Sequence, residues 1–115
     1  MATTATIEKL KRDRKKIEDL LRELENQMRE VEERYAAMLG EENKIHEELR
    51  QCREASEYSR LEMRLHPVAR RRREVEAEKQ AIERRIRGYR GELEKVKARI
   101  EYMRPKGEFV PHKEE

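Results

Sequence analysis

The sequence predicts an all-α protein built as a long antiparallel helical hairpin of the coiled-coil type. Three observations lead to this prediction: composition, charge balance and the spacing of the apolar residues. Of the 115 residues, 48% are charged and 35% are hydrophobic, which is too little apolar material for a round core. The 29 basic and 26 acidic residues nearly cancel, so the chain also differs from disordered sequences with high net charge.

The first half of the chain carries one apolar stripe at heptad spacing. Its members are Ile7, Leu10, Ile17, Leu21, Leu24, Met28, Val31, Tyr35, Met38, Ile45, Leu49 and Cys52. Only Arg14 and Glu42 interrupt the stripe with charge. A repeat of about 3.5 residues keeps one seam facing a partner helix. The pattern therefore predicts a first helical arm over residues 4–53.

A second apolar stripe, displaced by two residues in the heptad frame, predicts a second arm over residues 58–103. Its members are Tyr58, Leu61, Leu65, Val68, Val75, Ile82, Ile86, Tyr89, Leu93, Val96, Ile100 and Met103, with Arg72 and Lys79 as charged interruptions. Ordinary interruptions of a coiled coil insert three or four residues. A two-residue displacement therefore indicates that one helix ends and another begins.

The turn is expected near residues 53–58. Ser59 followed by Glu62 matches a capping box, and Tyr58 before it can pack on Met63 inside the new helix. If the chain folds back there, the numbers of facing residues sum to about 110, and each apolar position meets one on the other arm.

This pairing places Ile45 opposite Leu65 and brings Arg34 near Glu78. Residues 1–104 then form a single helical domain. Pro105 and Gly107 begin a stretch unsuited to helix, so residues 105–115 are predicted to be a flexible tail, in which Phe109 and Val110 are a candidate docking motif.

Gly40 and Pro67 leave a competing architecture open. Both are poor helix formers, and they share one position along the folded hairpin. In the hairpin they predict a kink or hinge. If they mark turns instead, the chain becomes a three-helix bundle with helices at about 4–39, 41–65 and 68–103.

Several classes of function are not expected. The single Cys52 cannot form an internal disulfide, and the three histidines have no zinc-ligand spacing. The carboxylates fit exposed helix positions, so we expect no catalytic residues, cofactor or metal. Without an apolar run for a bilayer or a signal peptide, we expect no membrane association and a soluble, cytoplasmic protein.

A binding surface is expected instead. The arginines Arg70, Arg71, Arg72 and Arg73, with Arg64 nearby, suit an acidic protein partner, whereas nucleic acid is disfavoured because no aromatic platform accompanies them. The narrow seam leaves apolar side chains for a partner or a second copy. The candidates for these contacts are Leu20, Leu39 and Met63.

Two short segments resemble the tubulin-folding cofactor A family. Gly40 and Glu41, with Asn43 and Ile45, resemble the first inter-helix loop of that family. Pro67, with Arg71 and Arg72, resembles its mid-chain proline and arginine pair. The resemblance implies a three-helix bundle that captures β-tubulin and associates with the cytoskeleton.

The sequence therefore predicts a non-enzymatic helical module that binds protein, in its most specific form a tubulin-folding cofactor or chaperone. The alternative is a self-associating coiled-coil scaffold or adaptor, working as a homodimer in a cytoskeletal or export assembly. Nucleic-acid binding through Arg70–Arg73 is the third hypothesis.

Overall fold

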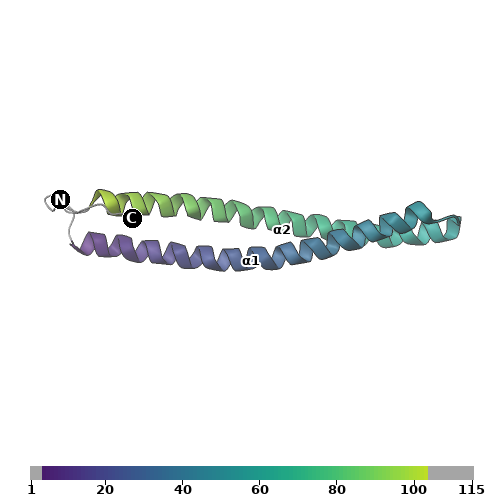
Figure 1. The fold of residues 1–115 in the computed structure, drawn as a ribbon, viewed down its shortest axis with the longest axis horizontal. Helices are drawn as coiled ribbons and strands as arrows, with labels where there is room; N and C mark the ends of the chain where they lie inside the picture. The colour runs from purple at the N-terminus through teal and green to yellow at the C-terminus, as the bar shows by residue number, and fades with distance from the viewer. Residues whose placement is uncertain (1–3, 104–115) are drawn as a thin grey trace. The chain divides into compact units, whose positions relative to one another are not determined.

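The computed structural model describes residues 4–103, which form two α-helices joined by a short turn (Figure 1). Helix α1 is Thr4–Gln51 and helix α2 is Ala55–Tyr102. No residue of this described range belongs to a strand. The all-α antiparallel hairpin is confirmed. The three-helix alternative is wrong, because α1 runs through Gly40 and α2 runs through Pro67 without a break.

The turn is shorter than the sequence suggested. Between the two helices lie only Cys52, Arg53 and Glu54. The Cys52 N–H donates to the Leu49 carbonyl at 3.3 Å, which tightens the end of α1. The Tyr58 N–H donates to the Glu54 carbonyl at 2.9 Å, so the hydrogen-bond ladder of α2 begins from Glu54.

The capping box predicted at Ser59 is wrong, because α2 has already begun at Ala55 and Ser59 lies inside the helix. An acidic side chain, Glu57, occupies the first turn of α2, where the helix dipole favours negative charge. Tyr58, which was predicted to pack in the seam, is 44% exposed.

The helices contribute to two compact units. Unit 1 contains residues 4–22 of α1 and 88–103 of α2, and unit 2 contains residues 23–87 with the turn. In each unit the two helical segments lie side by side (Figure 1). The start of α1 and the end of α2 thus lie in the same unit, as folding back at the turn predicts. The predicted tail at 105–115, with Phe109 and Val110, lies outside the described residues.

Each unit has its own apolar core. The buried hydrophobic residues of unit 1 are Leu10, Ile17, Leu21 and Ile100. Those of unit 2 are Leu24, Val31, Ile45, Leu61, Val68, Ile82 and Ile86. Every one of them belongs to one of the two predicted stripes, so heptad spacing identified the core. Burial of these side chains is the main stabilising contribution to the fold.

The core of unit 2 next to the turn is a distinct cluster. Ile45, Leu61 and Val68 form its buried centre, and Leu49, Cys52 and Leu65 pack against it. Ile45 is 1% exposed, among the lowest exposures in the described part of the chain. The cluster confirms the predicted pairing of this part of α1 with the beginning of α2.

Pro67 and Gly40 are both exposed helical residues of unit 2. Pro67 has no N–H to donate to the Met63 carbonyl four residues earlier, but Val68 beside it is buried in the cluster. Packing therefore keeps the helix in place across the proline. The hinge remains a prediction.

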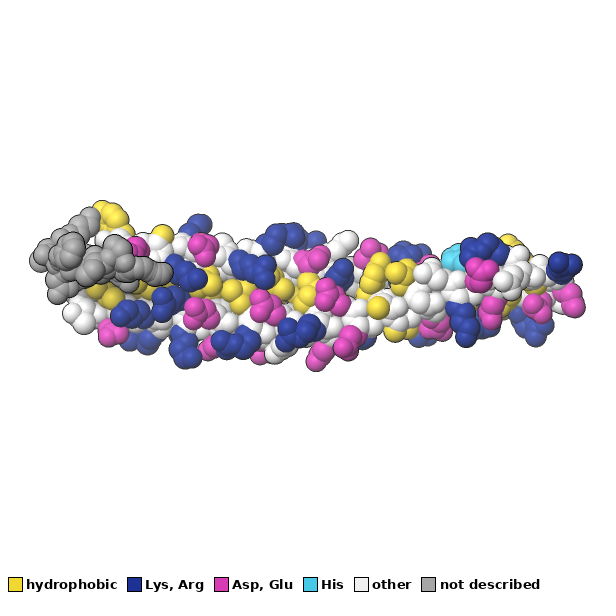
Figure 2. Space-filling model, in the orientation of Figure 1, with side chains coloured by type: hydrophobic (Ala, Val, Ile, Leu, Met, Phe, Trp, Pro, Cys, Tyr) yellow, Lys and Arg dark blue, Asp and Glu magenta, His cyan; other side chains and the backbone are white. Residues whose placement is uncertain are grey.

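The surfaces of the units are highly charged. Figure 2 shows Lys and Arg interspersed with Asp and Glu on both sides of an apolar line between the helices. No helix within residues 4–103 combines the length and apolarity that crossing a membrane requires.

Candidate functional site

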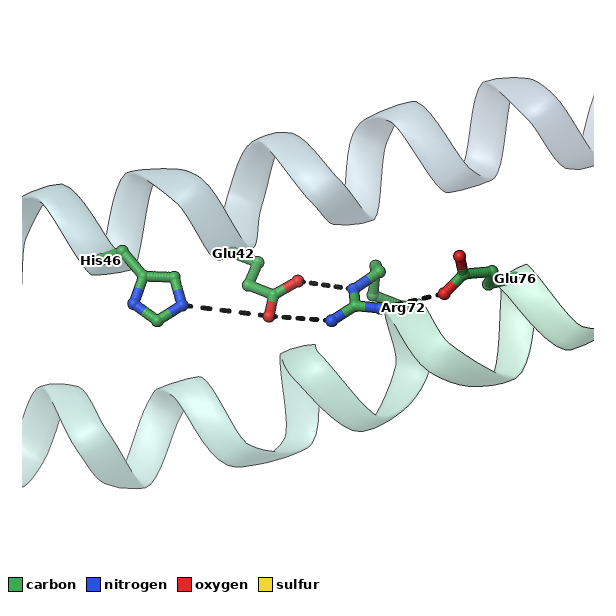
Figure 3. A network of polar contacts seen from close by, with 4 residues as sticks. All are labelled: Glu42, His46, Arg72 and Glu76. Atoms are coloured by element: carbon green, nitrogen blue, oxygen red, sulfur yellow. Dashed lines mark hydrogen bonds and ion pairs between the residues drawn. The ribbon is translucent and has the colours of Figure 1, made fainter.

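Two charged residues that interrupt the apolar stripes meet each other in the core of unit 2 (Figure 3). Arg72 Nε donates to Glu42 Oε1 at 2.8 Å, and Arg72 Nη2 donates to Glu42 Oε2 at 3.3 Å. The side chain of Glu42 is 10% exposed and that of Arg72 is 22% exposed. The guanidinium thus donates two hydrogen bonds to the carboxylate, and this bidentate arrangement is the strongest for this pair of groups.

The pairing follows from the direction in which helical side chains lean. A side chain in an α-helix points toward the N-terminal end of its own helix. In an antiparallel pair, side chains from the two helices therefore lean in opposite directions. Arg72 leans toward the turn and Glu42 leans away from it, so their end groups meet although their backbones are about one helical turn apart.

Lys79 and Tyr35 repeat this geometry. The Lys79 ammonium lies over the Tyr35 ring, 5.4 Å from its centroid, as a cation–π contact. The residue numbers sum to 114 for Lys79 with Tyr35 and for Arg72 with Glu42. Arg72 and Lys79, the basic residues that interrupt the second stripe, therefore each contact a residue of α1. In both pairs that residue lies about four residues closer to the connection between the helices than the position directly opposite.

Two further groups complete the network around Glu42. Arg72 Nη1 donates to Glu76 Oε1 at 3.0 Å, and His46 Nε2 lies 4.0 Å from Glu42 Oε2 (Figure 3). The hydrogen bonds from Arg72 lower the pKa of Glu42, while burial opposes this shift. The same bonds raise the pKa of Arg72. The network thus holds both charges at neutral pH.

Ion pairs at the edge of the seam also connect the helices of unit 2. Arg34 Nη2 is 2.8 Å from Glu78 Oε2, which confirms the predicted approach of these residues. Arg64 Nη1 is 3.9 Å from Glu48 Oε1, a looser pair. Both pairs are about half exposed, so solvent screens them and each contributes little to stability.

The arginine run separates into two roles. Arg72 lies in the seam and pairs with Glu42, so it does not face outward with the other three, and its role in partner binding stays a prediction. Arg70, Arg71 and Arg73 are exposed, and none of them forms an ion pair with a described residue. Four consecutive helical residues point around the helix axis, which is why one turns inward and the others do not.

The predicted apolar contacts do not gather at one place. Met63 is 74% exposed on α2, close in sequence to the arginines. Leu39 is half-buried on α1 of unit 2. Leu20, 43% exposed, belongs to unit 1. Only Met63 accompanies the arginines on one helix.

Sequence reasoning missed Arg60. It is exposed, has no ion pair within the described chain, and precedes Met63 by three residues, so the two lie on the same side of α2. Helical spacing from Met63 was the signal that could have identified it. We call the exposed set the α2 basic surface, which consists of Arg60, Met63, Arg70, Arg71 and Arg73.

An open depression of about 580 Å³ lies beside this surface, next to the turn. Its lining residues are Glu48, Gln51, Cys52, Glu57, Arg60, Leu61 and Arg64. Burial raises the pKa of the Cys52 thiol, and Cys52 Sγ donates to the Glu54 carbonyl at 3.3 Å. A raised pKa keeps the thiol protonated, which is the unreactive form. The depression therefore offers shape and mixed charge rather than a nucleophile.

Comparison with known proteins identifies no relative: no family model matches the chain, and no curated protein or solved structure matches it. Among the described residues, no group of three or more His, Cys, Asp or Glu side chains is arranged to hold a metal ion. The α2 basic surface, with its exposed arginines and Met63, is the candidate functional site.

Proposed function

We propose that the chain is a non-enzymatic protein-binding module, whose α2 basic surface takes an acidic segment of a partner chain. One observation carries this proposal. In unit 2, Arg34, Arg64 and Arg72 pair with glutamates of the opposite helix or their own, whereas the arginines of the α2 basic surface have no such partner. Arg73 adds its charge near Glu42 without an ion pair, and all of these arginines stay exposed.

The residue types suit a protein interface. Arginine has a planar guanidinium that binds carboxylates through two hydrogen bonds, and it is enriched at protein interfaces. Methionine is flexible and polarisable, so an exposed Met63 adapts to apolar groups of different shapes. Together they favour a partner that offers carboxylates around an apolar contact.

The most specific form of the proposal is capture of β-tubulin by a folding cofactor. Its support is the sequence resemblance at Gly40–Ile45 and at Pro67–Arg72. The three-helix fold that this resemblance implies is not the fold of the chain, and Arg72 belongs to the seam. The tubulin proposal thus rests on fewer residues than the general one.

Retention of purified tubulin and of poly-glutamate by the immobilised chain tests both forms. We expect the triple variant R70E/R71E/R73E to lose binding of either probe. The control R84E/R85E/R87E makes the same change in charge at three other exposed positions of α2 and should retain it. Poly-glutamate binding without tubulin binding would remove the tubulin form alone.

Two results contradict the general proposal. Equal loss in the triple variant and in its control would show that total charge, and not the α2 basic surface, decides binding. Binding of duplex DNA or RNA with no binding of either acidic probe at low salt would assign the arginines to phosphates instead.

A further inference from the structure

We propose that the acidic partner of the α2 basic surface is helix α1 of a second copy of this chain. The inference rests on the proposed function, because it names a partner for the same surface. The chain would then assemble with itself through surfaces outside the seam, and the seam contacts would remain within each copy.

The complementary surface is on α1 in unit 2. We call it the α1 acidic surface, and it consists of Glu30, Glu32, Glu33, Ala36, Ala37 and Gly40. All six residues are exposed. None of the three glutamates forms an ion pair with a described residue. Glu30 acts on Arg34 through its charge alone. The three exposed carboxylates can therefore meet a partner, as the arginines of α2 can.

The two helices of unit 2 differ in charge around these surfaces. In residues 23–51 there are nine Glu against four Lys and Arg, a net charge of −5. In residues 60–73, which hold the α2 basic surface, there are six Arg against one Glu, a net charge of +5. This difference favours contact of α1 from one copy with α2 from another over contact between like helices.

The two surfaces also differ in shape. Met63 projects from α2 with 74% of its surface exposed. On the α1 acidic surface the side chains next to the glutamates are small, and a Cβ added at Gly40 would meet no heavy atom within 4 Å. A large side chain of one copy can therefore lie against the backbone of the other at this place.

The geometry of unit 2 decides the type of assembly. Both helices turn their apolar stripes toward the seam, so their outer surfaces face in opposite directions. The α1 acidic surface and the α2 basic surface of one copy therefore cannot meet each other. A contact between two copies joins the α1 acidic surface of one to the α2 basic surface of the other. The dimer then still has one free acidic surface and one free basic surface, so further copies can add to it.

Sedimentation equilibrium at low salt tests the inference with two charge-reversal variants. The wild-type chain should exceed its monomer mass of 14.0 kDa as concentration rises, and it should return to that mass in about 1 M salt, where charges are screened beyond about 3 Å. The variants E30K/E32K/E33K and R70E/R71E/R73E should each be monomeric, because the surfaces that meet then carry like charges.

Mixing the variants provides the decisive measurement. An equimolar mixture should associate again with one-to-one composition, since each variant meets opposite charge on the other. The variant R84E/R85E/R87E should associate as the wild type does, and circular dichroism should show equal helix content in all samples.

A wild-type chain that stays monomeric at low salt, or a mixture that stays monomeric, overturns the inference. If poly-glutamate still binds the wild-type chain in an arginine-dependent way, the proposed function stands and only the second copy is excluded as the partner. If the chain binds neither poly-glutamate nor tubulin and also stays monomeric, the proposed function and this inference both fail.

Discussion

Glu42 and Arg72 form one ion pair with two hydrogen bonds across the seam of unit 2, although each alone breaks the apolar stripe of its helix. A buried charge is costly without a partner, but a well-paired one is tolerated. The pair occupies one layer between the cluster around Ile45 and the remaining core of the unit. Several measurable properties depend on this layer.

Removing one member of the pair should destabilise the fold more than removing both. In Arg72→Leu, the Glu42 carboxylate stays in the seam without its partner, which we expect to lower the free energy of unfolding by about 3 kcal/mol. In the double variant Glu42→Leu/Arg72→Leu the layer becomes apolar, and stability should return to within about 1 kcal/mol of the wild type or exceed it. Urea unfolding measures both; a double variant weaker than Arg72→Leu would contradict this account.

Acid should weaken the fold through Glu42. Its pKa is lowered from 4.5 by Arg72, so its folded-state pKa is below its unfolded-state value. Such a group stabilises the fold above the unfolded pKa, and this contribution is lost as pH falls through the folded pKa. We expect the free energy of unfolding to decrease below about pH 4.5.

The substitution Glu42→Gln should reduce the loss of unfolding free energy that acid causes in the wild type. The matched control is Glu47→Gln, which removes an exposed carboxylate whose pKa Arg50 also lowers. Because that pair is solvent-exposed, its removal should change the profile less. Identical profiles for the wild type and Glu42→Gln would rule out the role of Glu42 in acid sensitivity.

Deleting Arg53 and Glu54 should convert the hairpin into an intermolecular pair. The deletion removes the two-residue displacement between the stripes, so one heptad frame runs through the whole chain and a continuous helix becomes favourable. Two such helices can pair antiparallel and restore the same contacts between chains. Light scattering in about 1 M salt, which screens surface charge, should give twice the monomer mass of 14.0 kDa.

The control for this deletion replaces Arg53 and Glu54 with two glycines. It keeps the chain length and the displacement between the stripes, and it should remain a monomer in the same salt. If the deletion variant also remains a monomer, the register displacement is not what enforces the turn.

Replacing Gly40 with alanine should stabilise α1. The position is inside the helix, and the added methyl group would contact nothing within 4 Å. Alanine loses less conformational entropy than glycine in a helix, so the free energy of unfolding should rise by about 0.5–1 kcal/mol. Thermal unfolding checks this; a lower melting temperature would show that this position tolerates no side chain.

Replacing Pro67 with alanine tests the predicted hinge. Alanine restores the N–H that donates to the Met63 carbonyl, and the substitution should stabilise α2 by up to about 3 kcal/mol. Amide exchange in residues 63–68 should slow with it. Unchanged exchange there would mean that packing of Val68 already holds this turn of the helix, and the hinge prediction would be wrong.

The spacing of apolar residues by itself determined the two helices, the core and the place where the chain reverses. All buried hydrophobic residues are members of the predicted stripes, because 3.5-residue periodicity fixes which side of each helix is apolar. Arg34 and Glu78 were also predictable, since their positions on the two arms face each other. The sequence further indicated that the arginine run matters for binding, a hypothesis that stays open.

Only the tertiary structure decided which charged residues of the seam pair with each other. Heptad counting places backbones opposite each other, so Glu42 and Arg72 looked like two separate defects of the core. Their side chains lean toward each other, so the end groups meet although the two backbone positions are about one helical turn apart. Likewise, the start of α2 depended on a hydrogen bond to the Glu54 carbonyl and not on the serine cap that the sequence suggested.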